Sequence, residues 1–320
     1  MPCGGARWVM KFKSKIKNHY LCFIAIILAL YIVPIFTVHP FVLHLCFILF
    51  LHAALAQAFN LVAGFTGYLT LGHVAFFGVG AYTTAALINR AISPYIAMII
   101  GGLVAAALVL IYIPLFRLRG AYFAISSIFI SNSLYIIIKQ PVLGLGGSVG
   151  LTIPIPPIYS KVPYYYVSLS LMIFTIIVAY LIKCSKIGLG MFAIRQNEDA
   201  ALHFGINTLK LKIMALSVSA IFTGFAGGLY TYYVFYISPE TVFSPTLSLQ
   251  MNFMTIIGGL GTIMGPIMGA FILTSLSEVI SYTLGELTPF VYGVSIILIM
   301  LFLPEGVWGL LSKLIKKYSI

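Results

Sequence analysis

Very few residues of this sequence could take part in acid–base or metal chemistry. Only 6 of 320 residues are Asp or Glu and 6 are His, and no His/Cys/Asp cluster is visible. The four cysteines show no spacing typical of a metal site or a disulfide framework. The sequence therefore predicts a protein without a catalytic site, a bound metal ion or a cofactor.

The ionisable residues that do gather lie in residues 183–212, the longest polar interruption of an otherwise apolar sequence. This segment holds five of the 18 Lys and Arg residues and two of the 6 acids, Glu198 and Asp199. Residues 195–204 are expected to form a short helix, with Gly205 at the position of a C-cap glycine. A polar segment of this length between apolar spans indicates a partner outside the membrane.

Glycines and hydroxyls form a second group, in residues 60–84. The glycines at positions 64, 67, 72, 78 and 80 make a continuous helix costly. They either permit close helix packing or mark a helix break beside a translocation path. In the second case the break would expose backbone groups and the hydroxyls of Thr66 and Thr70, which could replace water around a polar solute. The candidate path residues here are Gly64, Thr66, Gly67, Thr70, Gly72 and His73.

A similar interruption follows in residues 247–282, where Gly258, Gly259 and Gly261 are further candidates for the path. Paired interruptions in two halves of a chain point to a central site in transporters built from repeats.

Other intramembrane polar residues allow two interpretations. His73 is either a pH sensor or a hydrogen-bonded structural residue. Ser127 and Ser131 share one helix face, which either lines a polar path or packs against a neighbouring helix. Polar side chains in residues 41–62 are expected to form interhelical hydrogen bonds, namely those of His44, His52, Gln57 and Asn60.

Composition defines the fold class. Sixty-one per cent of the residues are hydrophobic and 8% are charged, whereas a soluble domain carries about 25% charge. Apolar runs of about 20 residues predict transmembrane helices, so we expect an all-α, polytopic helix bundle with glycine-broken helices. The expected segments are 20–38, 41–62, a broken one ending near 87, 95–116, 121–138, 164–182, 213–236, 247–258, 262–282 and 289–303. Joining 247–282 into one span gives nine segments instead of ten.

The basic residues predict the topology. The net charge is +12, and 15 of the 18 Lys and Arg residues fall on one side of the ten-segment arrangement. Because cytoplasmic loops are enriched in Lys and Arg, both termini are expected in the cytoplasm of a multi-pass cell-membrane protein. We expect a basic N-terminus at 1–19, a transmembrane domain at 20–303 with its cytoplasmic loop at 183–212, and a basic tail at 304–320. The charge thus indicates anionic membrane lipid, and no nucleic acid.

The predicted outer loop, residues 139–163, contains a glycine-rich run with Gly146, Gly147, Ser148 and Gly150. It lacks the Lys-Ser/Thr ending of a P-loop and a preceding strand. No ATP site is expected in this chain.

Four segments in the same order resemble the permease subunits of branched-chain amino-acid ABC importers, and more closely the LivM type than the LivH type. They are NLVAGFTGYLTLGHVAFFGVGAYTT at 60–84, GGSVGL at 146–151, RQNEDAALHFGI at 195–206 and LQMNFMTIIGGLGTIMGPIMGA at 249–270. The third is similar to the loop by which ABC permeases dock on their ATPase subunits, but has an additional Asp after Glu198.

The resemblance implies an importer of Leu, Ile and Val. Its assembly would contain a second permease subunit as a heterodimer, two cytoplasmic ATP-binding subunits and an extracytoplasmic substrate-binding protein. ATPase coupling would involve Arg195, Glu198, Asp199, Ala200, Ala201 and Gly205.

Alternatives remain for each of these inferences. The charges at 195–199 could form a solvated face. Urea, short amides or nucleosides are rival substrates. An ion-coupled secondary transporter is a different class, which usually has acids or bases at mid-membrane, and only Glu278 is a candidate here.

Overall fold

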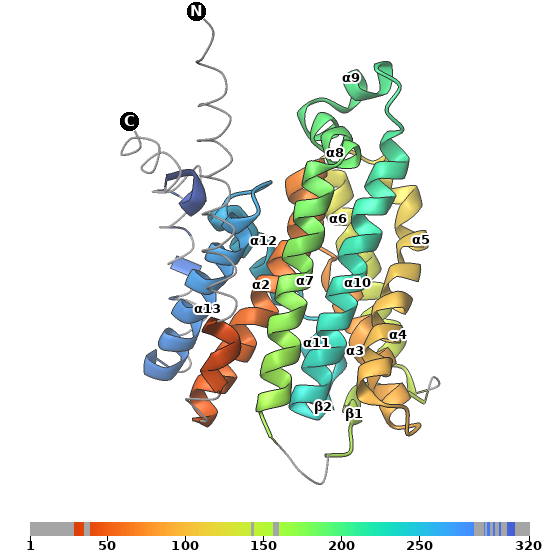
Figure 1. Ribbon diagram of the computed structural model, residues 1–320. Coiled ribbons are helices and arrows are strands. Elements are labelled where there is room, and N and C mark those ends of the chain that lie inside the picture. The colour runs from red at the N-terminus through yellow and green to blue at the C-terminus, as the bar shows by residue number, and fades with distance from the viewer. Residues whose placement is uncertain are drawn as a thin grey trace, which may run out of the picture.

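The computed structural model describes residues 29–34, 39–141, 144–155, 160–284, 291, 293–294, 297, 301 and 306–310. Long helices lie side by side in a bundle (Figure 1). The bounds of the elements, in chain order, are α2 Pro40–Thr66, α3 Val74–Ile88, α4 Pro94–Ala107, α5 Val109–Tyr112, η1 Ile113–Arg117, α6 Ala121–Lys139, η3 Gly147–Val149, β1 Leu151–Thr152, α7 Val162–Cys184, α8 Lys186–Gln196, α9 Glu198–His203, α10 Thr208–Val234, β2 Tyr236–Ile237, α11 Pro239–Val242, α12 Pro245–Gly258 and α13 Met264–Leu284.

Five stretches of the described chain are helical, long and apolar enough to cross a membrane: Pro40–Thr66, Pro94–Arg117, Ala121–Lys139, Val162–Cys184 and Thr208–Val234. Val74–Ile88 and Met264–Ile280 are shorter apolar helices. The all-α bundle is therefore confirmed, but a count of ten segments is not. Both termini and most of the expected spans at 20–38 and 289–303 lie outside the described residues.

α10 lies at the centre of the bundle and packs against α2, α3, α4 and α7. The approach to α3 is close, because a Cβ atom on Gly80 would lie 2.1 Å from the carbonyl oxygen of Gly224. Such contacts between small residues allow helices in a membrane to pack tightly. Gly78 and Gly80 lie within the continuous helix α3, so for them the packing interpretation is correct.

The first helix break lies beyond Gly64, between α2 and α3, and the second lies between α12 and α13. α2 continues through Gly64 to Thr66 and ends at Gly67, which has φ +78°, and α3 begins at Val74. In the second stretch α12 ends at Gly258 and α13 begins at Met264. The predicted separation of residues 247–282 into two helices is confirmed.

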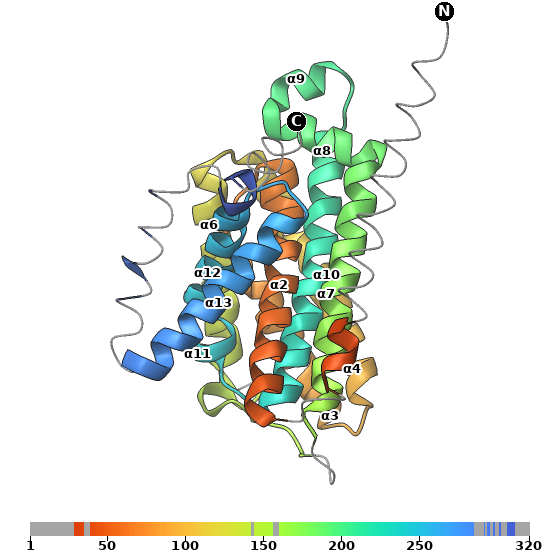
Figure 2. The same cartoon turned by 60° about the vertical axis from the view of Figure 1, so that its left-hand side comes forward.

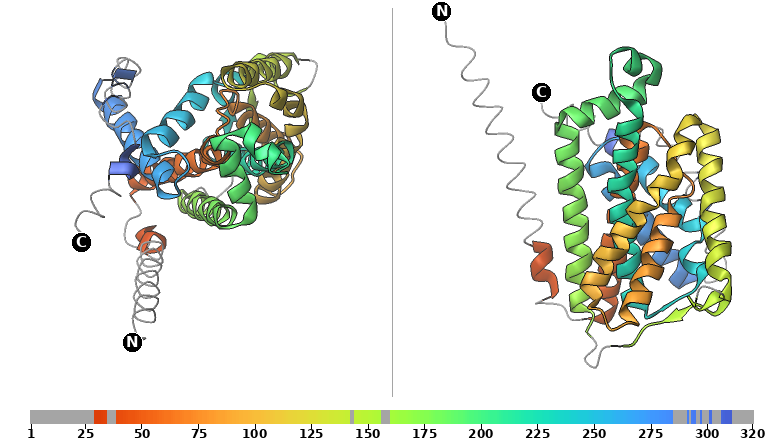
Figure 3. Two further views of the ribbon diagram at one scale, coloured as in Figure 1. Left: turned by 90° about the horizontal axis from the view of Figure 1, so that it is seen from above. Right: turned by 90° about the vertical axis from the view of Figure 1, so that its right-hand side faces the viewer.

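The two ends of the bundle differ. α8 and α9 project from one end, and the antiparallel pair β1–β2 lies at the other (Figures 1 and 3). We call them the α8–α9 end and the β1–β2 end. α12 and α13 lie along one side of α2 (Figure 2).

The segment 183–212 is mostly helical rather than an irregular loop. It contains two helices where one was expected, because Asn197 is extended and caps α9 through its side chain. Gly205 follows the last residues of α9 with φ +77°, which agrees with the expected C-cap position. Lys212 lies inside α10, and 2% of its surface is exposed.

Candidate functional site

The two glycine-broken stretches contact each other near the α8–α9 end. Asn60 on α2 is fully buried; its Oδ1 accepts a hydrogen bond from Gly261 N at 2.8 Å, and its Nδ2 donates to Thr262 O at 2.7 Å. A Cβ atom on Gly64 would lie 2.6 Å from Gly261 N, so the two backbones meet only because residue 64 is glycine. We call this contact between residues 60–64 and 260–262 the glycine junction.

Two cations reach the glycine junction. Arg195 on α8 donates from Nη1 to Gly64 O at 2.6 Å and to Leu260 O at 3.5 Å. Lys183, at the end of α7, donates to Gly261 O at 3.5 Å. These carbonyls lie at or just after the C-terminal ends of α2 and α12, where a helix carries partial negative charge. Arg195 and Lys183 therefore stabilise both helix ends electrostatically.

The first interruption, residues 67–73, is stabilised by side chains from within the bundle. Ser127 Oγ on α6 accepts hydrogen bonds from the amides of Leu71 and Gly72, both at 3.0 Å. The buried Tyr112 hydroxyl donates to Gly72 O at 3.0 Å. Backbone groups without helical partners are thus paired, as an interrupted helix in a membrane requires. For Ser127 the packing interpretation is correct.

The other polar candidates in this region also have structural contacts. His73 is fully buried, and its Nε2 lies 3.0 Å from Ser219 Oγ and 3.1 Å from Thr223 Oγ1 on α10, which supports the structural interpretation. Thr66 donates to Val62 O within its own helix. Thr70 Oγ1 is buried and has no hydrogen-bond partner among the described residues.

Two of the four side chains on α2 form the expected hydrogen bonds to other helices, whereas Asn60 bonds to the turn between α12 and α13. His44 Nδ1 lies 2.6 Å from Tyr233 Oη, and His52 Nδ1 lies 3.0 Å from Thr274 Oγ1. The buried amide of Gln57 has no partner among the described residues.

α9 is bound to three parts of the bundle through its first two residues. The Glu198 carboxylate pairs with the ammonium group of Lys212 on α10 and accepts a hydrogen bond from the Tyr68 hydroxyl at 2.5 Å. Asp199 forms a bidentate pair with Arg119, which precedes α6, at 2.7 and 2.9 Å. Glu198 and Asp199 thus connect α9 to α10, to the first interruption and to the start of α6.

These contacts fix the protonation states at this end. Burial raises the pKa of the Glu198 carboxyl, but hydrogen bonds from Lys212 and Tyr68 outweigh burial and bring the pKa below its ordinary value of 4.5. The hydrogen bond from Arg119 holds the pKa of Asp199 below its usual range. Burial and the hydrogen bond to Glu198 raise the pKa of Tyr68. Near neutral pH both carboxylates are therefore ionised and the phenol is protonated.

A cavity of about 550 Å³ adjoins these groups and the first interruption. Its lining includes Thr66, Gly67, Arg119, Arg195, Glu198 and Asn252. The cavity therefore brings residues of the two predicted sites, the path and the coupling segment, into one place.

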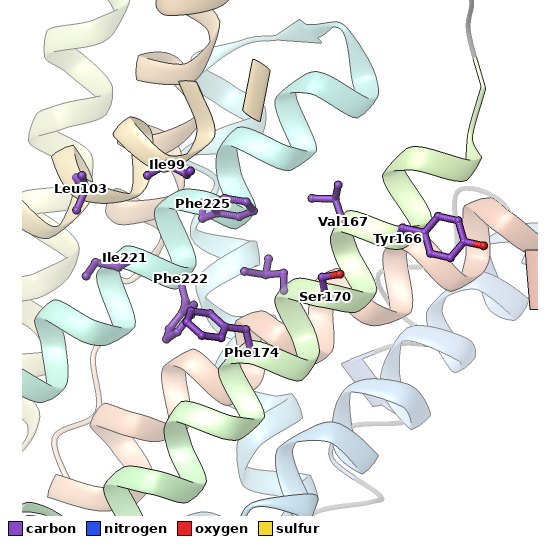
Figure 4. Close-up of a pocket in the computed structure, with 10 residues that line it drawn as sticks. Ile99, Leu103, Tyr166, Val167, Ser170, Phe174, Ile221, Phe222 and Phe225 are labelled. Carbon is purple, nitrogen blue, oxygen red and sulfur yellow. The ribbon is translucent and has the colours of Figure 1, made fainter. Parts of the chain in front are cut away.

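A second cavity, of about 470 Å³, is an apolar groove between α4, α7 and α10 (Figure 4). Phe174, Phe222 and Phe225 lie along it, and the only side-chain oxygens among its lining residues belong to Tyr166 and Ser170. This groove offers no group that could bind a charged solute.

The predicted outer-loop residues lie at the β1–β2 end, away from the glycine junction. Gly146 precedes η3 and has φ +75°, Gly147 and Ser148 belong to η3, and Gly150 follows it. A Cβ atom on Gly150 would lie 2.1 Å from Ile237 O, so glycine there permits β1 to pair with β2. The structure does not bring this loop together with the other predicted site residues.

Sequence reasoning missed Tyr68, Arg119 and Lys212 as parts of the site. Lys212 was counted with the residues of a hydrophilic segment, and no local pattern distinguishes a lysine that is buried against a distant tyrosine. The signal for Asn60 was stronger, since a lone amide in an apolar helix usually finds a partner on another helix. In the part of the chain that the structure describes, no group of three or more His, Cys, Asp or Glu side chains could hold a metal ion.

A bundle of apolar helices with two interrupted segments and a polar segment at one end defines a helical membrane transport protein. Residues 41–303 match the family model described as branched-chain amino acid transport system / permease component. The chain belongs to this family.

Several curated proteins are similar to this chain. It is 27% identical to the high-affinity branched-chain amino acid transport system permease protein LivM of Escherichia coli, over 80% of this chain and 67% of that protein. The same protein of Salmonella typhimurium is also 27% identical, over 84% and 70%. The autoinducer 2 import system permease protein LsrC of Yersinia pestis is 26% identical, over 34% and 32%. No solved structure matches the chain.

Proposed function

We propose that this chain is the transmembrane permease subunit of an ATP-driven importer of branched-chain amino acids. The observation that carries the proposal is the family match over residues 41–303, and the names of the similar proteins supply the substrate class. The chain moves the solute and performs no hydrolysis itself. Its partners are a second permease subunit, two ATP-binding subunits and an extracytoplasmic substrate-binding protein.

The distribution of charged residues supports a cytoplasmic location of the α8–α9 end. Arg119 and Asp199 pair at this end, where Lys183 lies in the last turn of α7 and Lys186 and Arg195 belong to α8. Cytoplasmic loops are enriched in Lys and Arg. We therefore place residues 183–212, the N-terminus at 1–19 and the tail at 304–320 in the cytoplasm, and the β1–β2 end outside.

Exposed apolar side chains support the assignment of α9 as the ATPase-docking element. Phe204 is 86% exposed and Leu202 is 49% exposed, although both lie in a segment outside the apolar spans. Adjacent exposed apolar side chains on a polar segment are typical of a protein contact. Glu198 and Asp199, in the same helix, then carry a movement of α9 into the bundle.

The candidate path runs from the cavity of about 550 Å³, which Thr66 and Gly67 line, to the glycine junction, and Arg195 contacts both. A zwitterionic amino acid is expensive to desolvate, so a path needs backbone and side-chain polar groups along it. Residues 64–73 and 258–261 supply these groups beside the coupling segment.

A reconstitution experiment tests the proposal. The chain is purified with its candidate ATPase subunits and permease partner, and leucine uptake into proteoliposomes is measured with and without ATP. We expect uptake to require ATP, and the Phe204→Ser variant to lose ATPase binding. Val149→Ser, which changes a 78% exposed residue at the β1–β2 end, is the matched control and should retain it.

Each alternative has its own outcome. ATPase binding without leucine uptake would support an ATP-driven transporter whose substrate is urea, a short amide or a nucleoside instead. Uptake driven by an ion gradient with no bound ATPase would contradict the proposal and indicate a secondary transporter.

A further inference from the structure

Arg195 is an exposed residue, but its guanidinium group contacts the backbone of both interrupted segments. Its Nη1 group donates to Gly64 O of α2 and to Leu260 O in the turn after α12, at 2.6 and 3.5 Å. One guanidinium group on α8 thus contacts both interrupted segments. These segments are far apart in the sequence and share few other polar contacts, chiefly those of Asn60.

The two accepting carbonyls are groups that a helix cannot satisfy by itself. The last four carbonyls of a helix lack an intrahelical donor, and Gly64 lies in the last turn of α2. Leu260 follows the end of α12 at Gly258. A planar guanidinium carries five N–H donors in a fixed arrangement. It can therefore cap two helix ends at once, which the compact ammonium group of lysine does less well.

The glycines around Arg195 provide the space that its side chain occupies. A Cβ atom on Gly261 would lie 2.2 Å from Arg195 Nη1, and a Cβ atom on Gly67 would lie 3.2 Å from Arg195 Cγ. Both glycines also have positive φ, +77° and +78°, a conformation that favours glycine. Glycine at both positions thus leaves room for the Arg195 side chain beside both breaks.

We propose that Arg195 is a positioning residue that holds the two interrupted helices together and transmits the movement of α8 to both of them. The proposal rests on the proposed function and deepens it. When ATPase subunits displace α8, the guanidinium leaves both carbonyls together, and the glycine junction then loses its shared cap. Interfaces of this kind switch between discrete arrangements rather than deforming continuously.

The exposed pair Arg119–Asp199 is a useful contrast. Its side chains are 60% and 61% exposed, and exposed ion pairs usually contribute little. Arg195 is exposed as well, but its partners are the backbone carbonyls of Gly64, which is buried, and Leu260. Its loss leaves helix ends without a cap, which is a larger change than the loss of a surface pair.

The first test uses the complete transporter in proteoliposomes. Arg195→Gln should retain binding of the ATPase subunits, but leucine uptake per ATP hydrolysed should fall at least tenfold. Arg195→Lys should recover only a minor part of this loss. Lys186→Gln, which removes an exposed charge from the same helix, is the matched control and should behave as the unmodified protein. Unchanged uptake per ATP in Arg195→Gln, or complete recovery in Arg195→Lys, would overturn the proposal.

The second test does not depend on transport. Spin labels are placed on cysteines introduced at Leu189 on α8 and Leu249 on α12, both exposed, after replacement of the native cysteines by alanine. We expect a narrow distance distribution with Arg195 and a broad one in Arg195→Gln. Equal widths would contradict the proposal.

If Arg195→Gln fails to assemble, the uptake per ATP and the spin-label distances are measured on Arg195→Lys, and these measurements then test the proposal. Absence of leucine uptake in the unmodified transporter would refute the proposed function alone, because the spin-label distances still test Arg195.

Discussion

The interruption at residues 67–73 and the one at residues 259–263 are stabilised from different directions. The first is surrounded by side chains of the bundle interior, since Ser127 and Tyr112 pair its backbone groups. The second is a tight turn whose contacts come from Asn60 and from the cations Arg195 and Lys183 at the α8–α9 end. The first interruption is thus paired mainly by side chains of the bundle interior, and the second partly by side chains from the α8–α9 end.

The two interruptions therefore differ in how strongly their contacts depend on α8. The first interruption has backbone contacts to Ser127 and Tyr112 that do not involve α8. The turn at residues 259–263 receives both of its cations from α8 and α7. Because Arg195 also contacts the last turn of α2, we infer that a displacement of α8 affects both interruptions, and the second more than the first.

The largest expected effect concerns the second interruption, where the backbones of α12 and α13 approach each other closely. A Cβ atom on Gly258 would lie 1.9 Å from Gly265 O, and backbone cannot move aside without separating α12 from α13. Gly258→Ala should therefore destabilise the protein by about 3 kcal/mol, measured by thermal unfolding in detergent. Gly205→Ala, with nothing within 4 Å but φ +77°, is the comparison and should cost about 1 kcal/mol. Equal unfolding temperatures of the two variants would contradict this ranking.

The next largest effect is a loss of stability caused by removing side-chain hydrogen bonds at the second interruption. Asn60→Ala removes two hydrogen bonds to the backbone of residues 261 and 262, at about 1 kcal/mol each in a membrane protein. The matched control is Gln57→Leu, one turn earlier on α2, because the buried Gln57 amide has no partner among the described residues. We expect Asn60→Ala to unfold at a lower temperature and Gln57→Leu not to. If both variants unfold alike, burial rather than the hydrogen bonds of Asn60 stabilises the junction.

A smaller effect should be confined to the first interruption. Ser127→Ala leaves the amides of Leu71 and Gly72 without their acceptor, which we expect to cost about 1 kcal/mol. Ser131, one turn further on the same face of α6, is buried without a hydrogen-bond partner among the described residues, so Ser131→Ala should be neutral. Amide hydrogen exchange should accelerate at residues 71–72 in Ser127→Ala only. Exchange that accelerates equally in both variants would argue against this pairing.

The sequence was sufficient for features that depend on local composition. Apolar runs and glycine clusters predicted the helices and the two interruptions, because hydropathy and backbone cost are properties of short segments. The contact between the interruptions was not predictable in this way, since Gly261 and Asn60 are 201 positions apart. The buried pairing of Lys212 was missed for the same reason, as its environment includes Tyr68, 144 positions away. The glycine-broken stretches were recognisable in the sequence, but only the fold shows that Arg195 contacts both of them.

The smallest expected effect is a pH dependence of α9, which tests whether the charge pair between Glu198 and Lys212 of α10 holds this helix in place. The folded-state pKa of Glu198 lies below the ordinary 4.5, so the ionised carboxylate stabilises the attachment of α9. This contribution is fully present above pH 4.5 and is lost as the pH falls through the lowered folded-state pKa. A spin label on a cysteine introduced at Phe204, with the native cysteines replaced, should therefore gain mobility as the pH falls below 4.5 and through the lowered folded-state pKa. Glu198→Gln should show higher mobility at neutral pH and little further change in this range. Mobility in the unmodified protein that does not respond to acid would mean that the hydrogen bond from Tyr68 and the helix cap, rather than the charge pair with Lys212, hold α9 in place.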